Sequence, residues 1–313
     1  PYHSARNINK AIYHFTESAK QNDPVAQFHL GYIYYIGTDI PRDINKSLKY
    51  FALSANQSFF MSQYLLGNIY LQGEFVQQDV DKAIHLLTLA ADKNYLKAIT
   101  LLGKIYSDSI YGKKNINKAL YYLSLGANQD DCYSQTMIGA IYMFGIGTPV
   151  DLPKAIHYFE LAADNDGEYA YYCLGRIYSM ECSRRDINKS LYYYNISAEK
   201  YKNQFALFEL GKLYYFGKGV PQDINKAIYY LKLASERHFA TAYFFLGYIY
   251  IFHKDSEIDH NKGLHYLEMA ANQNQKDALF TLGFFYYQGA FYSRNVQKAI
   301  MYLTLSAKNS HIE

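Results

Sequence analysis

Eight glycines recur along the chain at an unbroken interval of 36 residues. They are Gly31, Gly67, Gly103, Gly139, Gly175, Gly211, Gly247 and Gly283. A fixed period of this size indicates a stack of one repeated supersecondary unit. A single unit of this kind cannot bury its apolar face alone, so the stack as a whole is the folding entity. This spacing limits the possible folds more than any other feature of the sequence.

Each glycine lies within a pattern typical of a helix, as in the copy around Gly103. Leu or Ile precedes the glycine directly (Leu102), Tyr follows it by three residues (Tyr106), and a small residue precedes it by five (Ala98). At about 100° per residue these positions fall within an arc of roughly 140°. They predict a buried stripe on a first helix, with the glycine where another helix approaches too closely for a side chain.

A lysine marks a second helix in each repeat, and an Asp or Asn stands three residues before it. A polar side chain at this point can accept a hydrogen bond from the first turn of the helix, so we expect these residues to be N-caps. The predicted caps are Asn7, Asp43, Asp79, Asn115, Asp151, Asp186, Asp223, Asp259 and Asn295.

The linkers between the two helices usually begin with a glycine such as Gly37, which favours the left-handed end of a helix. Three linkers have Ser109, Glu181 or His253 at this position, and we expect them to adopt another conformation. One register shift occurs around Lys189. The interval from Gly175 to Lys189 is one residue shorter than in the other repeats, and the interval from Lys189 to Gly211 is one residue longer.

The chain is long enough for two ordinary domains, but the unbroken repeat predicts one elongated domain spanning residues 1–313. Half of the residues are hydrophobic and 18% are aromatic, which is enough for a continuous core. The net charge is only +3, so it provides no attraction to nucleic acid or to an anionic membrane. No apolar stretch is long enough to cross a bilayer, so no membrane insertion is expected. The first residue is Pro1, and we interpret the chain as a segment of a longer protein.

The three cysteines, Cys132, Cys173 and Cys182, have no ligand-like spacing, and their number is odd. Free thiols in a reducing compartment are therefore expected, and the cytoplasm is the predicted location. The lumen of the endoplasmic reticulum is the alternative. Four glycosylation sequons occur, and a chain this rich in Asn and Ser is expected to contain such sequons by chance. They begin at Asn45, Asn56, Asn188 and Asn195.

The order of these positions resembles the Sel1-like repeat family of αα solenoids, which is related to tetratricopeptide repeats. The clearest copy contains Ala206, Leu210-Gly211, Tyr214, Gly217-Lys-Gly-Val220, Asp223, Lys226-Ala227, Tyr230 and Ala234-Ser235. The resemblance covers nearly the whole chain. It implies an all-α, right-handed superhelix of about eight two-helix repeats, plus one leading helix at about 7–20. It also implies that the first helices line the concave side and that the protein is a scaffold.

No motif for catalysis, cofactor binding or metal binding emerges from the sequence. The segment from Gly211 to Gly217-Lys218 has five residues between its glycines, whereas a phosphate-binding loop has four, and it follows a helix instead of a strand. His253 lies in a linker, and His260 and His265, five residues apart, lie on different faces of the helix that follows, which argues against a metal site. We therefore expect no enzyme active site, no cofactor and no bound metal.

The predicted functional surface is the groove lined by the first helices. It combines the positions three before, one after and four after each glycine. The candidate residues are Tyr32, Tyr35, Tyr64, Asn68, Lys104, Tyr172, Arg176, Lys212, Tyr215, Tyr248 and Tyr287, and the same positions include Leu71 and Ile251. Aromatic residues with Arg are typical of protein-binding hot spots. The alternative interpretation is that these tyrosines only pack against neighbouring repeats.

These observations predict a non-catalytic protein-interaction scaffold that binds a protein or peptide in the groove. Lys104, Arg176 and Lys212 would form a row of cations suited to a segment with acidic and apolar side chains. Family analogy suggests assembly of a signalling or protein-degradation complex. RNA binding is disfavoured, because the position after each glycine is neither uniformly polar nor uniformly basic. The remaining alternative is an accessory repeat region of an enzyme. The sequence predicts no oligomeric state.

Overall fold

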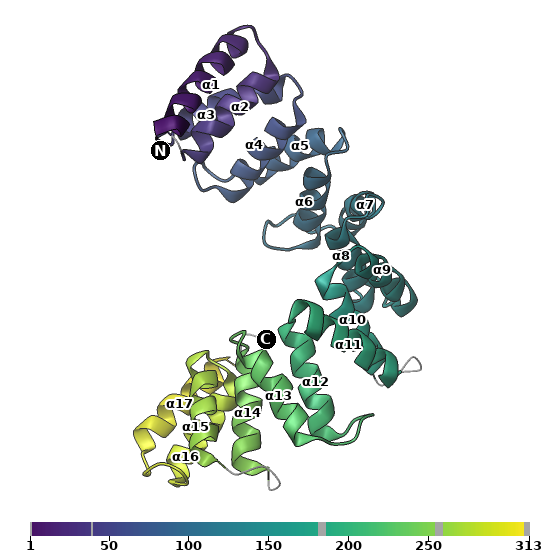
Figure 1. Cartoon of the computed structure of the whole chain (residues 1–313), viewed down its shortest axis with the longest axis vertical. Coiled ribbons are helices and arrows are strands. Elements are labelled where there is room, and N and C mark those ends of the chain that lie inside the picture. Colours follow the sequence, from purple (N-terminus) through teal and green to yellow (C-terminus); the bar gives the residue numbers. More distant parts are fainter. Residues whose placement is uncertain (1, 39, 181–185, 254–258, 310–313) are drawn as a thin grey trace. The chain divides into compact units, whose positions relative to one another are not determined.

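The computed structural model describes residues 2–38, 40–180, 186–253 and 259–309, with the backbone alone at residues 2–7 (Figure 1). The described residues form helices, turns and loops, and no strand occurs among them. The chain divides into two compact units, Pro1–Asn165 (unit 1) and Asp166–Glu313 (unit 2). The predicted all-α solenoid of paired helices is confirmed.

The described part of unit 1 consists of helices α1 to α9. Their bounds are α1 (Tyr2–Lys20), α2 (Pro24–Ile36), α3 (Ile44–Asn56), α4 (Phe60–Gln72), α5 (Val80–Ala91), α6 (Leu96–Ser107), α7 (Ile116–Ala127), α8 (Cys132–Phe144) and α9 (Leu152–Asp164). The bounds in unit 2 are α10 (Glu168–Ser179), α11 (Ile187–Tyr201), α12 (Gln204–Phe216), α13 (Ile224–Ser235), α14 (Ala240–Phe252), α15 (His260–Asn272), α16 (Lys276–Gln288) and α17 (Val296–Asn309).

The even-numbered helices are the predicted first helices, and the odd-numbered helices are the second helices. Each first helix packs most extensively on the second helix that follows it, and within each unit the next repeat then packs on this pair (Figure 1). The buried stripe of α6, which includes Ala98 and Leu102, is fully covered in this way. The core is therefore a continuous layer between successive helices of a unit.

The glycine column lies at a close helix–helix contact, as predicted. A β-carbon at Gly139 would lie 2.8 Å from the Phe159 ring of α9, which is itself fully buried. Every other copy has an equivalent second-helix side chain over the glycine. These side chains are Phe51, Leu87, Leu123, Tyr194, Leu231, Leu267 and Leu303.

The predicted N-caps of the second helices are confirmed from α3 onward. The Asp43 carboxylate accepts from the Lys46 N–H at 3.0 Å, and the other copies repeat this bond. This N–H, followed by the Lys46 side chain, lowers the pKa of Asp43 below the usual 3.8. The cap therefore stabilises the fold above that pH and is lost on further acidification. The prediction for Asn7 is wrong, because α1 already begins at Tyr2 and Asn7 lies inside the helix.

The lysine that follows each cap joins the two helices of a repeat. In α7, the Lys118 ammonium lies 5.2 Å from the centre of the Tyr106 ring, which stacks on Tyr122 at 5.9 Å. Equivalent stacks pair Tyr34 with Tyr50, Tyr142 with Tyr158, Tyr178 with Tyr193, Tyr214 with Tyr230, Tyr250 with Tyr266, and Tyr286 with Tyr302. The repeated lysine and tyrosines are thus explained by packing and cation–π contact.

The linkers that lack the first glycine differ from the others, as predicted. Helices such as α2 end on a left-handed glycine, Gly37, with φ 67°. Helix α6 ends instead on an extended Asp108, just before Ser109, and α14 ends on an extended His253. Glu181, in the third linker of this kind, lies outside the described residues.

The loops from a second helix to the next first helix each contain a residue with positive φ. These residues also recur every 36 positions, and they are Asn22, Ser58, Asn94, Asp130, Asp166, Lys202, His238 and Asn274. The extra residue of the register shift lies in α11, which has 15 residues. Only Lys202 and Asn203 then separate α11 from α12. None of the eight is glycine, although each adopts a conformation that glycine tolerates best.

Candidate partner-binding surface

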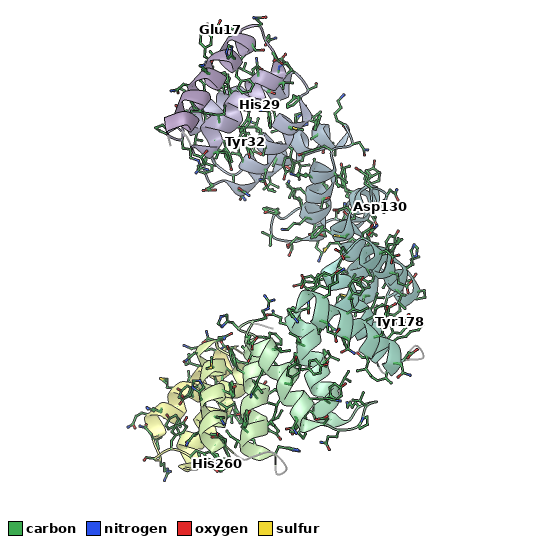
Figure 2. All side chains as sticks on the ribbon, viewed as in Figure 1. Glu17, His29, Tyr32, Asp130, Tyr178 and His260 are labelled. Carbon is green, nitrogen blue, oxygen red and sulfur yellow. The ribbon has the colours of Figure 1, made fainter. Side chains whose placement is uncertain are left out.

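Two neighbouring hollows lie on the first-helix face of unit 1. The first hollow has a volume of about 540 Å³ and is lined by α2, α4 and the start of α6. Its residues are Phe28, His29, Tyr32, Met61, Tyr64, Leu65, Tyr95 and Lys97. His29 and Tyr32, one helical turn apart on α2, are labelled in Figure 2. This hollow is mostly aromatic, with one lysine at its border.

The second hollow continues from the first toward α8. It measures about 490 Å³ and is lined by Tyr64, Leu96, Lys97, Thr100, Leu101, Lys104, Asp131 and Tyr133. Tyr64 and Lys97 line both hollows, so the two form one surface across consecutive repeats. Burial raises the pKa of Tyr64. Burial, followed by Tyr64, also raises the pKa of Tyr95. Both phenols therefore stay neutral and present apolar rings with a polar edge.

The structure brings three of the predicted groove residues of unit 1 to this surface. Tyr32, 44% exposed, stacks on Phe28 at 6.1 Å beside Tyr64, and Lys104 lies on the far side of the second hollow. Tyr35 packs instead against Phe51 and beneath the Arg42 guanidinium, which is 5.2 Å from its ring centre. Asn68 lies half-buried on α4 and lines neither hollow.

In unit 2, the predicted residues divide into packed and exposed rings. Tyr172 of α10 packs against Tyr194 and Phe205 at 6.1 and 5.5 Å, and burial raises its pKa. Tyr215 of α12 is also held in place, because its ring meets Phe245 and His253 edge-on. For Tyr172 and Tyr215, packing between repeats therefore accounts for much of the ring.

The rings nearer the end of unit 2 are open. Tyr248 lies exposed on α14 beside Phe252, with ring centres 5.0 Å apart. Tyr287 on α16 is 53% exposed, and Arg294 lies 5.8 Å from its ring centre. These rings offer apolar contact area on the exposed surface of first helices.

The cations of unit 2 are not equivalent to Lys104. The Lys212 ammonium lies 3.0 Å from both carboxylate oxygens of Glu209 and 5.2 Å from the Phe208 ring centre. Arg176 lies beside Tyr172, where its charge opposes the effect of burial on the pKa of that phenol. The charge of Lys212 is thus already paired within its own helix.

The prediction that the position four after each glycine faces the groove is wrong for Leu71 and Ile251. Leu71 is 2% exposed and Ile251 is 5% exposed, and both belong to the core. The side chain of Ile251 lies over Gly263 of α15, so this position points toward the second helix of its own repeat.

Sequence reasoning missed Tyr95, Lys97 and Tyr133. Lys97 and Tyr133 stand six residues before their glycines, which places them on the same helical face as the position one after the glycine. That signal was present in the sequence. Tyr95 is the N-cap residue of α6 and makes no capping bond with its side chain; its ring packs on Phe60 and Tyr64 at 5.0 and 5.3 Å. An aromatic residue at an N-cap gave no such signal.

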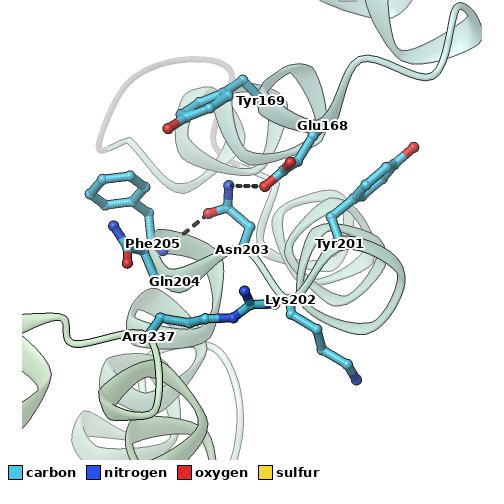
Figure 3. Close-up of a pocket in the computed structure, with 8 residues that line it drawn as sticks. All are labelled: Glu168, Tyr169, Tyr201, Lys202, Asn203, Gln204, Phe205 and Arg237. Carbon is cyan, nitrogen blue, oxygen red and sulfur yellow. Dashed lines mark hydrogen bonds between the residues drawn. The ribbon is translucent and has the colours of Figure 1, made fainter. Parts of the chain in front are cut away.

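A third hollow, of about 200 Å³, lies at the loop between α11 and α12 (Figure 3). Its centre is Asn203, whose amide oxygen accepts from the N–H groups of Phe205 and Ala206 at 3.0 and 3.1 Å. The Asn203 amide nitrogen donates to Glu168 at 3.3 Å, and the Lys202 side chain points away (Figure 3). These bonds satisfy the buried Asn203 amide. Capping of α12 therefore accounts for the polar groups at the centre of this hollow.

The residues considered for chemistry are dispersed. His253 packs on Tyr215, His260 on Phe291 (His260 is labelled in Figure 2) and His265 on Tyr266. In the part of the chain that the structure describes, no three His, Cys, Asp or Glu residues are grouped as a metal site requires. Gly211 lies inside α12, so it belongs to no phosphate-binding loop.

Cys132 and Cys173 are free and half-buried, and burial raises the pKa of the Cys173 thiol to about 12. Cys182 lies outside the described residues. The described helices include none that combines the length and the apolar character needed to cross a bilayer.

The sequence matches the Sel1 repeat family in nine consecutive copies. They cover residues 4–23, 24–59, 61–95, 96–131, 132–167, 168–201, 204–239, 240–275 and 276–311. The chain belongs to the Sel1 repeat family. The predicted resemblance is therefore confirmed, and the Sel1 copies coincide with the 36-residue glycine period.

Two solved Sel1-type structures are similar over most of the chain. One is c5321, a protective antigen of uropathogenic Escherichia coli strains with an SLR fold; it is 27% identical, with a TM-score of 0.79 over 95% of this chain. The other is a Sel1 repeat protein from Oxalobacter formigenes, 28% identical, with a TM-score of 0.76 over 89% of this chain and 80% of its own. This chain spans 64% of the length of c5321. No curated protein matches the sequence.

Proposed function

We propose that this Sel1 repeat chain is a non-catalytic scaffold that binds a segment of another protein along its first helices. The observation that carries the proposal is the pair of connected hollows in unit 1, which share Tyr64 and Lys97. Sel1 repeats form solenoids that typically bind proteins, and repeat stacks present extended surfaces suited to this.

The form of the surface favours a protein segment over a small molecule. Both hollows are open to solvent, and the two are placed in series across α2, α4, α6 and α8. Tyrosines provide large contact areas at low entropic cost, and they are enriched among residues that dominate protein interfaces. A segment lying across the repeats would insert successive side chains into successive hollows.

The type of complex is proposed on family analogy alone. Assembly of a signalling complex or of a protein-degradation complex fits a Sel1 scaffold, although a fold does not by itself fix a function. A cytoplasmic location is supported by the free thiols Cys132 and Cys173, and the lumen of the endoplasmic reticulum is the alternative. The rival function is an accessory repeat region of an enzyme, and neither similar Sel1 structure carries an enzyme's name.

The proposal is tested with a variant of the hollows, Tyr32→Ala/Tyr64→Ala. We expect circular dichroism to show that this variant is folded. Its affinity for the natural partner should fall at least tenfold, a loss of binding free energy on the order of 1.4 kcal/mol. The matched control is Tyr121→Ala/Tyr229→Ala, which removes two exposed tyrosines from second helices. Equal retention by the folded hollow variant and by the control would contradict binding at this face.

A further inference from the structure

Helix α6 presents two lysines to the hollows of unit 1. Lys97 borders both hollows, and Lys104, two turns further along the helix, borders the second. Both side chains are exposed, and neither forms an ion pair with a described residue. They are seven positions apart along the helix, which corresponds to about 10 Å. The aromatic surface thus carries two cations whose charges are not neutralised by near neighbours.

Several other lysines of the chain are engaged. Lys46 and Lys154 pair with their cap carboxylates at 3.1 Å, and Lys113 pairs with Asp81 at 2.5 Å. Lys212, which has the position of Lys104 in its own repeat, pairs with Glu209. The two lysines of α6 therefore stand apart in having an apolar hollow between them and no described counter-ion.

The acidic groups nearest this surface are already used by the protein. The Asp131 carboxylate caps α8 by accepting from the Ser134 N–H at 2.8 Å, and it also accepts from the Thr100 hydroxyl at 3.4 Å. Asp108, whose charge reaches Tyr133, accepts from the Ile110 N–H at 3.0 Å. These carboxylates serve backbone donors, and they leave the lysines available.

On the basis of the proposed function, we infer that the hollows of unit 1 bind an acidic segment of a partner protein, in which Asp or Glu side chains pair with Lys97 and Lys104 and a bulky apolar side chain between them enters the second hollow. Carboxylates are preferred to phosphate groups, because no arginine lines either hollow to supply a bidentate fork. In an extended segment, alternate residues face the same side, so two acidic residues four positions apart and an apolar residue midway between them all face the surface. The acidic residues then span about 13 Å, which the two long lysine side chains can reach.

The test uses a phage-displayed library of random peptides of about twelve residues, long enough when extended to cross both hollows. The library is panned on the whole chain, and the enriched peptides are synthesised with a fluorescent label and titrated by fluorescence polarisation. The test variant is Lys97→Glu/Lys104→Glu. The control, Lys10→Glu/Lys49→Glu, makes the same change of net charge on exposed second-helix lysines of unit 1. Circular dichroism checks that both are folded.

We expect enriched peptides with paired acidic residues around a Leu, Phe, Tyr or Trp. Their affinity is expected to fall about tenfold or more in the Lys97/Lys104 variant, to stay unchanged in the control, and to weaken with added salt. Peptides that require Tyr64 but bind the Lys97/Lys104 variant equally well, or that carry basic residues, would overturn this inference and leave the proposed function standing. A library that yields no peptide dependent on Tyr64 would overturn both.

Discussion

At the scale of single residues, the glycine column shows how close packing outweighs helix propensity. A glycine within a helix costs about 1 kcal/mol relative to alanine, yet all eight first helices contain one at the same position. At Gly139 the reason is the Phe159 ring, which fills the place of a β-carbon. The ring is fully buried, so it cannot move aside without disturbing the core.

We therefore expect Gly139→Ala to lower the free energy of unfolding by about 1–3 kcal/mol, because overpacking outweighs the better helix propensity of alanine. Urea denaturation followed by circular dichroism measures the change. A double-mutant cycle with Phe159→Ala provides the control, since the two substitutions should be strongly coupled if this contact is the cause. A variant as stable as the parent would show that the helices adjust at no cost.

At the scale of elements, the loops between repeats turn on a left-handed residue that is never glycine. His238 has φ 57° and Asn274 has φ 60° at equivalent points of two successive repeats, and both side chains are exposed. The left-handed conformation costs most L-residues about 1–2 kcal/mol, whereas Asn tolerates it through local hydrogen bonds. The two loops thus have the same geometry and different intrinsic strain.

The expected effect of His238→Gly is a gain in stability on the order of 0.5–1 kcal/mol, after subtraction of the greater flexibility of glycine in the unfolded chain. The change is measured as a rise in the midpoint of thermal unfolding. Asn274→Gly is the matched control and is expected to change the midpoint little. If both variants gained equally, strain at the left-handed position would not be the explanation.

At the scale of the whole molecule, the repeat made the fold predictable from the sequence. Eight internal copies of Gly, Tyr, Asp and Lys identified both helices of each repeat, their caps and the close contact at residues such as Gly139. The prediction failed at Asn7, where no preceding helix repeats the pattern and α1 begins earlier. Periodicity thus determined what the copies share and gave less information where they differ.

The candidate surface was harder to predict, because it depends on which side chains the neighbouring helices cover. Helical spacing alone allowed both the position four after each glycine and the position six before it to face the groove. Leu71 and Ile251 turned inward onto second helices, while Lys97, six residues before its glycine, remained outside. Which of these positions is covered depends on the neighbouring helices, and sequence spacing does not specify this. Tyr32, Tyr64 and Lys104 stand three before or one after their glycines, and these side chains line the hollows.

Because each helix packs chiefly on its neighbours in the chain, we expect a local defect in unit 1 to stay local. Gly139→Ala should speed amide hydrogen exchange in α8 and α9 and leave α2 and α3 unchanged. Gly31→Ala, where a β-carbon would lie 2.6 Å from the Phe51 ring, should have the opposite distribution. Exchange is measured by mass spectrometry on peptides from the four helices. If either substitution accelerated exchange equally in all four helices, unit 1 would unfold as one cooperative block, and its repeats would not behave as a chain of neighbour-coupled elements.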